Sequence, residues 1–353
     1  MTRPAPLRLH MNENTAGCAP DVLQAVRGLT ARDLAQYPDY AGAEAACARH
    51  FAVDPAGVFL TNGLDDGLHA VANRSRTYGA ARPGFEAIVI EPAFEMFAQA
   101  AESADARVVR VTMDEGFAFP LARVLAALTP RTRLIFVNDP NNPTGAGVPG
   151  TAVERIAAAA PEALVLLDEA YADFSGRTMI GPVLDQYRNL VIGRTFAKAY
   201  GLAGLRIGAL IGHPDTIAPI RSRQPPYAVN AVAACALVAA LQANDATART
   251  VAAAQASKDR IYDWCRSRGL TCWPSEANFV LVRFGPAVSS IVGAVAERGV
   301  LIRDRSAVPG CAGCARIAAS VVEHTDACLA ALDAVLPAVD QPNERQRVSS
   351  HGV

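Results

Sequence analysis

The chain has 353 residues, of which 51% are hydrophobic and 19% are charged, and its formal net charge is −1 at pH 7. This length and apolar content allow a large buried core, built as two domains or as one large domain with a lobe. A near-neutral chain without a basic stripe argues against a nucleic-acid-binding protein, and no apolar run reaches the ~18 residues that a membrane span needs.

The first ten residues lack the apolar core of a signal peptide, so we expect a cytoplasmic protein whose eight cysteines are reduced. Cys311 and Cys314 have the spacing of a metal-binding or redox pair. Because neither a second cysteine pair nor a suitably spaced histidine accompanies them, no metal site is predicted.

Along the chain, an N-terminal arm over 7–20 precedes amphipathic stretches that alternate with short apolar runs, the pattern of helices and buried strands. Helices are expected over 20–29, 41–51, 121–128, 153–160, 231–242, 246–268 and 291–297. Strands are expected to begin at 58 and to cover 87–94, 107–113, 134–138, 164–171, 189–193, 206–211, 277–282, 300–304 and 314–318.

Lys198 lies in a segment rich in Ala, Gly and Leu, residues 194–208, between two of these strands. Poor solvation lowers the pKa of a lysine and favours the neutral amine that forms a Schiff base with a carbonyl. Eight residues further on, Arg206 offers a fork of donors suited to a phosphate. A lysine in a surface loop is the alternative interpretation.

Several polar or aromatic residues stand where apolar strands end, which is the edge of an α/β sheet that binds ligands. Asp168 ends such a strand, and a carboxylate there needs a cation or hydrogen bonds, although a helix-capping aspartate is also common. The turn at 62–66 precedes a helix start whose backbone amides can bind an anion, or is an ordinary turn and cap. Phe94 can stack on an aromatic ring or belong to the core.

These motifs, in their order, resemble those of fold-type I pyridoxal-phosphate (PLP) aminotransferases, and most closely those of histidinol-phosphate aminotransferases. The segment 195–208 is similar to S-x-[ST]-K-x-[FY]-G-L-A-G-x-R-x-G, while N-N-P-T-G stands at 141–145 and D-E-A-Y at 168–171. The resemblance implies an α/β fold whose large domain has a mostly parallel sheet flanked by helices, with a smaller α/β C-terminal domain.

The domain limits implied are an N-terminal arm that forms part of the small domain, a large PLP-binding domain, a small C-terminal domain and a disordered tail. They cover 1–35, 36–240, 241–338 and 339–353, respectively.

The resemblance also implies roles for individual residues. Lys198 would carry PLP as a Schiff base and act as the catalytic base, Asp168 would pair with the pyridinium nitrogen, and Tyr171 would bind the phenolic oxygen. The further cofactor contacts implied are Gly63, Leu64, Asp65, Phe94, Asn142, Thr195, Arg206 and, from the neighbouring subunit of a homodimer, Tyr37. Those implied for the substrate are Asn14, Arg303 and Arg316.

From the residues alone, Tyr37 fits simple surface packing equally well, and the two arginines fit solvated strand ends. The expected activity is a ping-pong transfer of an amino group from histidinol phosphate to 2-oxoglutarate, as in histidine biosynthesis. Ala16, Leu64 and Ala197 depart from the family pattern, so an aromatic or specialised amino donor stays open. A lyase resembling threonine-phosphate decarboxylase is a further alternative, and a PLP-sensing regulator ranks last because no basic DNA-binding segment precedes the domain.

Overall fold

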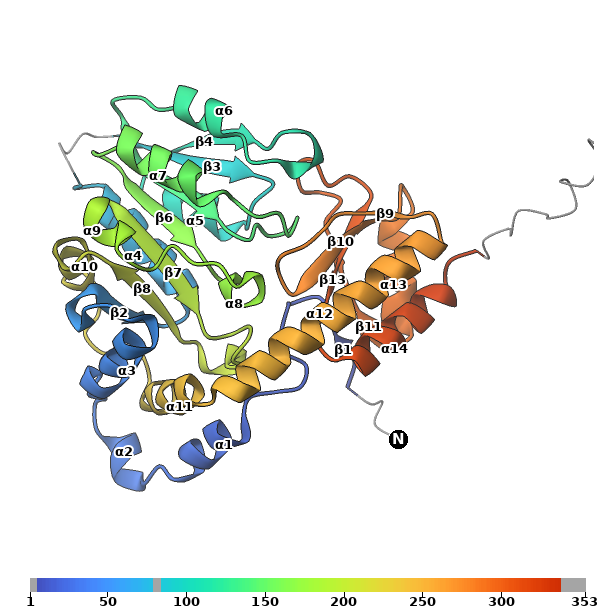
Figure 1. The fold of residues 1–353 in the computed structure, drawn as a ribbon, viewed down its shortest axis with the longest axis horizontal. Coiled ribbons are helices and arrows are strands. Elements are labelled where there is room, and N and C mark those ends of the chain that lie inside the picture. Colours follow the sequence, from blue (N-terminus) through green and yellow to red (C-terminus); the bar gives the residue numbers. More distant parts are fainter. Residues whose placement is uncertain (1–4, 79–83, 338–353) are drawn as a thin grey trace, which may run out of the picture.

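The computed structural model describes residues 5–78 and 84–337, so the tail predicted at 339–353 lies outside the described residues. A seven-stranded sheet has helices on both faces, and a smaller sheet lies beside it (Figure 1). The strand order is β2-β8-β7-β6-β5-β3-β4, and every neighbouring pair is parallel except the two that include β8. These strands are β2 (Val58–Thr61), β3 (Glu86–Glu91), β4 (Arg107–Thr112), β5 (Thr132–Asn138), β6 (Leu164–Asp168), β7 (Leu190–Thr195) and β8 (Gly208–Gly212).

The central strands of the large sheet are apolar throughout because both faces of the sheet are buried. In β5, Ile135 and Val137 enter one core, whereas Leu134 and Phe136 enter the other. Successive side chains of a strand point to opposite faces, so a sheet covered on both sides requires these continuous apolar runs. Helices that precede, separate and follow these strands in the sequence cover the two faces of the sheet.

Helices α4, α5 and α10 supply buried residues to one core, while α1, α3, α6, α7 and α11 supply the other. The helices of this part are α1 (Pro20–Arg27), α2 (Ala31–Ala35), α3 (Ala41–Phe51), α4 (Leu64–Ser75), α5 (Met96–Ser103), α6 (Leu121–Ala126), α7 (Gly150–Ala159), α8 (Ala172–Ser175), α9 (Val183–Gln186), α10 (Pro214–Arg221) and α11 (Ala231–Gln242).

The smaller sheet is antiparallel, with the order β12-β13-β10-β9, and its own core includes Trp264, Val280 and Ile317. Helix α12 runs from the end of α11 to this sheet (Figure 1). The elements of this part are α12 (Asn244–Ser267), β9 (Thr271–Cys272), β10 (Phe279–Arg283), α13 (Val288–Glu297), β11 (Val300–Leu301), β12 (Arg303–Asp304), β13 (Cys314–Ala318) and α14 (Val322–Asp333).

The N-terminal arm joins the two parts. Its strand β1 (Leu7–Arg8) pairs in parallel with β11, and Leu9 is buried in the core of the smaller sheet. The chain then passes between the two sheets before α1 packs against α11. Residues 10–12 are therefore placed at the junction of the two sheets.

Two predicted strands are wrong in detail. Residues 300–304 do not form one strand, because the chain changes partners at the buried Ile302: β11 pairs with β1, and β12 pairs with β13. The strand expected over 206–211 begins only at Gly208, since Arg206 has a left-handed backbone conformation, φ 52°, that ends the preceding turn. Each predicted helix begins and ends within three residues of the corresponding observed helix.

No single helix within 5–78 and 84–337 has both the length and the apolar composition needed to cross a membrane. Helices α11 and α12, which meet at an angle of 79°, pass that test only as a pair.

A buried ion-pair network fixes the strand that leads into the Lys198 loop. Arg194 on β7 is 4% exposed, and its guanidinium lies 3.1 Å from a carboxylate oxygen of Glu169 and 2.7 Å from one of Asp173. Its cation also lies over the ring of Phe51, 5.0 Å from the centroid. Removing one partner of a buried ion pair leaves an uncompensated charge.

We predict that Arg194→Met lowers the free energy of unfolding by about 3–5 kcal/mol. The matched control is Arg188→Met, because the Arg188–Asp215 pair is exposed at both side chains, and we expect a change below about 1 kcal/mol. Denaturant unfolding of both variants measures the difference. Equal losses in the two variants would contradict the structural role assigned to Arg194.

Candidate active site

A cavity of about 230 Å³ opens where the carboxyl ends of β5, β6 and β7 meet the N-terminal arm and the smaller sheet. It brings together most of the residues that the sequence singled out: Leu64, Asp65, Phe94, Asn142, Asp168, Tyr171, Thr195, Lys198, Arg206, Arg303 and Arg316. Ala197, one of the departures from the family pattern, also lines it, as do residues that the sequence did not single out: His10, Met11, Asn12, Leu68, Glu95, Asn138, Ala170 and Arg305.

Asp168 ends β6 at the base of this cavity and is buried. One carboxylate oxygen accepts a hydrogen bond of 2.9 Å from the backbone N–H of Ala170. Across the described part of the chain, no ion pair joins Asp168 to a lysine, arginine or histidine. Burial therefore raises the pKa of its carboxyl group to about 7. The site offers a buried acid that lacks a cation.

Lys198 lies in the loop after β7, and its Nζ donates a hydrogen bond of 2.9 Å to the backbone oxygen of Met11. Burial, followed by the charge of Arg316, lowers the pKa of its amine to about 8. The sequence contains only one other lysine, Lys258, which donates to the backbone oxygen of Ser275 and does not line the cavity. Lys198 is thus the lysine of this site, and the scarcity of lysines is a signal the sequence interpretation missed.

The turn before α4 and Arg206 form a cup for an anion. The first-turn N–H groups of any helix lack intrahelical partners, and among the described residues no side chain caps α4, so its first-turn N–H groups can bind an anion. Arg206 donates to Asp65 over 3.0 Å, and a Cβ on Gly63, whose φ is 76°, would stand only 2.6 Å from its guanidinium. The guanidinium therefore lies directly against this turn. Thr195 also lines the cavity, and its hydroxyl accepts from the N–H of Ala197.

Asn12 was missed by the sequence interpretation. It is buried, has a φ of 54°, and donates a hydrogen bond of 2.9 Å to the Tyr171 hydroxyl. Its side-chain oxygen is buried and has no hydrogen-bond partner within the described part of the chain. A buried acceptor of this kind next to Tyr171 is available to a ligand or to water. No local sequence pattern predicts the pair, since the two residues are 159 positions apart.

The two arginines predicted to bind substrate stand opposite each other in register on β12 and β13. Arg316 is buried, and it donates to the side-chain oxygen of Asn142 and, over 2.7 Å, to the backbone oxygen of His10. Burial lowers the pKa of its guanidinium to about 10, which leaves it charged at neutral pH. Arg303 is more exposed, and no ion pair is found for it among the described residues. The two cations give this end of the cavity a preference for anions.

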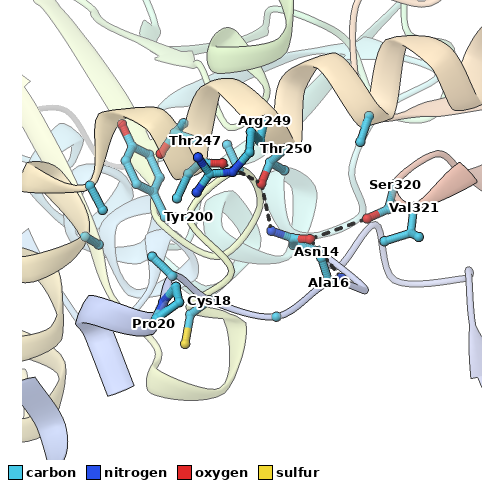
Figure 2. A pocket seen from close by; sticks show the side chains of 17 residues that line it. Asn14, Ala16, Cys18, Pro20, Tyr200, Thr247, Arg249, Thr250, Ser320 and Val321 are labelled. Carbon is cyan, nitrogen blue, oxygen red and sulfur yellow. Dashed lines mark hydrogen bonds between the residues drawn. The ribbon is translucent and has the colours of Figure 1, made fainter. Parts of the chain in front are cut away.

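Two predicted residues lie away from this cavity. Asn14 lines a second cavity of about 250 Å³ between the N-terminal arm and α12, where its amide donates to the Thr250 hydroxyl over 3.1 Å (Figure 2). Tyr37 is 79% exposed and stacks on Tyr227, with ring centroids 4.4 Å apart. Within one subunit, neither residue contributes to the cavity around Lys198.

Gly208 is where β8 approaches the anion cup most closely. A Cβ at this position would stand 2.8 Å from the backbone nitrogen of Leu64 and 3.0 Å from the backbone oxygen of Arg194. We predict that Gly208→Ala destabilises the fold by about 1–3 kcal/mol and weakens phosphate binding, because overpacking displaces the first turn of α4. Thermal unfolding with and without added inorganic phosphate measures both effects. Gly204→Ala is the control, since its Cβ would meet no atom within 4 Å; similar behaviour of the two variants would refute the prediction.

The chain matches the family model of aminotransferase class I and II over residues 5–332. It is 36% identical to an aromatic amino acid aminotransferase of Thermobifida fusca over 302 residues, 84% of this chain and 82% of the relative. It is 35% identical to histidinol-phosphate aminotransferase 2 of Pseudomonas aeruginosa over 338 residues, 94% of this chain and 89% of the relative.

Among solved structures, histidinol-phosphate aminotransferase from Sinorhizobium meliloti in complex with pyridoxal-5'-phosphate is similar, with a TM-score of 0.82 and 28% identity. The similarity covers 94% of this chain and 91% of that one. These comparisons confirm the fold class and the family that the sequence motifs indicated. The chain belongs to the class I and II aminotransferases.

Proposed function

We propose that this aminotransferase uses PLP to move an amino group from histidinol phosphate to 2-oxoglutarate. The observation that carries the proposal is that one cavity holds both Lys198, whose amine has a lowered pKa, and Asp168, a buried acid that forms no ion pair with any described side chain. A catalytic amine and an acid able to pair with a cationic ring nitrogen are the two groups this chemistry requires.

The residues present fit the cofactor. The first-turn amides of α4, Arg206 and Thr195 form a cup for its phosphate. Asp168 offers the partner for a protonated ring nitrogen, and Phe94 supplies an aromatic wall. The polar groups for the ring oxygen are those of Asn142 and Tyr171. When bound, PLP supplies an electron sink for the negative charge that develops at the donor Cα.

Each of these residues then has a defined task. The neutral amine of Lys198 would take the proton from the donor Cα and return it two atoms further along, to the carbon beyond the shared nitrogen, as a general base and then a general acid. The carboxylate of Asp168 holds a proton on the ring nitrogen. Asn12 fixes the hydroxyl of Tyr171 by its hydrogen bond, and Arg316 binds the anionic group attached to the donor Cα. The burial of these groups strengthens their interactions by excluding water.

The substrate assignment is supported by the charge of the cavity and by the relatives. Arg303 and Arg316 suit two acidic groups, which 2-oxoglutarate carries, and a phosphate suits the same cations. Relatives named histidinol-phosphate aminotransferase match up to 94% of this chain. A second candidate donor is an aromatic amino acid, because similar relatives are named aromatic amino acid aminotransferase.

We also propose a homodimer in which Tyr37 reaches the phosphate cup of the neighbouring subunit. Large apolar side chains are exposed on α1, on α2 and in the segment after α2, where Leu23, Leu34 and Tyr37 are 48%, 62% and 79% exposed. Such side chains are typical of an interface. The domain limits 36–240 and 241–338 are part of this proposal, since α12 leaves the large sheet near residue 244.

The two lysines allow a direct test of the cofactor link. Borohydride reduction of the PLP-treated protein, followed by peptide mapping, should place the cofactor on Lys198 and leave Lys258 unmodified. Lys198→Ala should lose turnover and the modification together, whereas Lys258→Met should keep both. Modification at Lys258 alone would end the proposal.

The lowered pKa of Lys198 predicts how cofactor capture depends on pH. Because the neutral amine attacks, and because its pKa is about 8, the initial rate of PLP capture should rise several-fold between pH 7 and 8 and level off above about pH 9. An ordinary lysine, with a pKa near 10.4, would instead gain about tenfold per pH unit throughout that range. Stopped-flow absorbance of cofactor-free protein mixed with PLP distinguishes the two profiles.

The donor is tested by half-reactions, in which each donor is mixed with the PLP-loaded protein without an acceptor and the cofactor absorbance is followed. Histidinol phosphate and glutamate should both convert the cofactor. If phenylalanine or tyrosine reacts and histidinol phosphate does not, the aromatic donor is correct and the aminotransferase assignment is unaffected.

A further inference from the structure

The cavity contains an ion pair that has no task in the mechanism above. Glu95 lies immediately before α5, and Arg305 immediately follows β12. A guanidinium nitrogen of Arg305 donates to a carboxylate oxygen of Glu95 over 2.8 Å, across a sequence separation of 210 residues. Both residues line the cavity, so the pair joins the large sheet to the smaller one at the wall of the site.

Arg305 is built into this wall. Its side chain is only 4% exposed, and its buried Nε has no hydrogen-bond partner among the residues that the structure describes. A buried N–H group is normally paired with protein, water or a ligand. The pairing with Glu95 therefore leaves one donor of the guanidinium unused inside the wall of the cavity.

Glu95 supplies the complementary acceptor. Its side chain is 47% exposed. Although burial alone would raise the pKa of its carboxyl group, hydrogen bonds from its own backbone N–H and from Arg305 hold that pKa below its ordinary value. It is therefore an ionised acceptor at neutral pH. The other two acids in the cavity lining are committed elsewhere, Asp65 to Arg206 and Asp168 to the base of the cavity.

We propose that Glu95 determines the amino donor, with Arg305 as its positioning residue, by selecting a side-chain ring that carries both a hydrogen-bond donor and an acceptor. This inference rests on the proposed aminotransferase function. A neutral imidazole matches the pair, because its N–H can donate to Glu95 and its other nitrogen can accept from Arg305.

The charges of the cavity also separate the ring from the anionic groups of the substrates. A phosphate or carboxylate is repelled by Glu95 and attracted by the unpaired cations Arg303 and Arg316, so the two kinds of group bind at different places. A phenyl ring would leave the remaining acceptor of Glu95 and the remaining donor of Arg305 unpaired, and a site built for hydrogen bonding discriminates strongly against such an analogue.

The test compares two donors in single-turnover half-reactions of the PLP-loaded protein: histidinol phosphate and phenylalanine. For Glu95→Leu, we expect the ratio of their second-order rate constants to shift against histidinol phosphate by at least about tenfold. Glu95→Gln keeps an acceptor oxygen and should recover part of the ratio. A purely structural role would lower both rate constants together and leave the ratio unchanged.

The matched control is Glu91→Leu. Glu91 precedes Glu95 by four residues and forms an ion pair of 2.9 Å with Arg110, but it does not line the cavity. The ratio of the rate constants for histidinol phosphate and phenylalanine should be the same in Glu91→Leu as in the unaltered protein. Arg305→Lys, which keeps the charge and loses the fork, should shift the ratio in the same direction as Glu95→Leu.

The outcomes separate this inference from the proposed function. If the unaltered protein converts no amino donor, glutamate included, the proposed function fails. If it converts histidinol phosphate and Glu95→Leu leaves the ratio unchanged, the specificity role of Glu95 is overturned while the proposed function stands. A preference of the unaltered protein for phenylalanine also overturns it.

Discussion

The site depends on a carboxylate buried at the end of a parallel strand. The carboxylate of Asp168 has one backbone hydrogen bond and no ion pair with a described side chain, and burial, with smaller contributions from Asp65 and Glu169, raises its pKa to about 7. A buried carboxylate stays ionised when a ligand supplies a cation or hydrogen bonds, because an unpaired buried charge is otherwise neutralised by protonation. The neighbouring strands place their polar residues around the same point, since the carboxyl ends of parallel strands share one edge of the sheet. The apolar strands thus support the site, and Asp168 marks the point where a cationic ring nitrogen would find its partner.

Burial also affects a positive charge in the site, that of the Lys198 amine. Lys198 has a pKa of about 8 because it is desolvated and because the Arg316 guanidinium is close. Arg316 stays charged at neutral pH, and its hydrogen bonds to Asn142 and to the backbone of His10 hold it against the large sheet and the arm. One cation of the smaller sheet therefore has two effects: it offers a place for an anion, and it lowers the pKa of the Lys198 amine. Binding of an anion to Arg316 would weaken the second effect, which links substrate binding to the protonation of Lys198.

Much of the large sheet and most of the site could be predicted from the sequence, because continuous apolar strands followed by polar residues are local patterns. Lys198, Asp168 and Asn142 each lie in a short motif at a strand end. The contacts Asn12–Tyr171 and Glu95–Arg305 could not be predicted, since they join residues 159 and 210 positions apart and depend on how the smaller sheet docks on the larger one. The division of 300–304 into two strands could not be predicted either, because tertiary structure decides which strands pair.

The departures from the family pattern have a physical explanation in the anion cup. Leu64, which stands where the pattern has a serine, is 7% exposed, and its side chain packs over Gly193 of β7. A Cβ on Gly193 would stand 2.8 Å from a methyl carbon of Leu64, so the glycine provides the space for the leucine. The leucine side chain therefore fills the core between α4 and the sheet and offers the cup only its backbone N–H. With Ala197 also lacking a hydroxyl, the donors that the cup offers to an anion are backbone amides, Thr195 and above all Arg206, whose strained φ of 52° holds it at the turn.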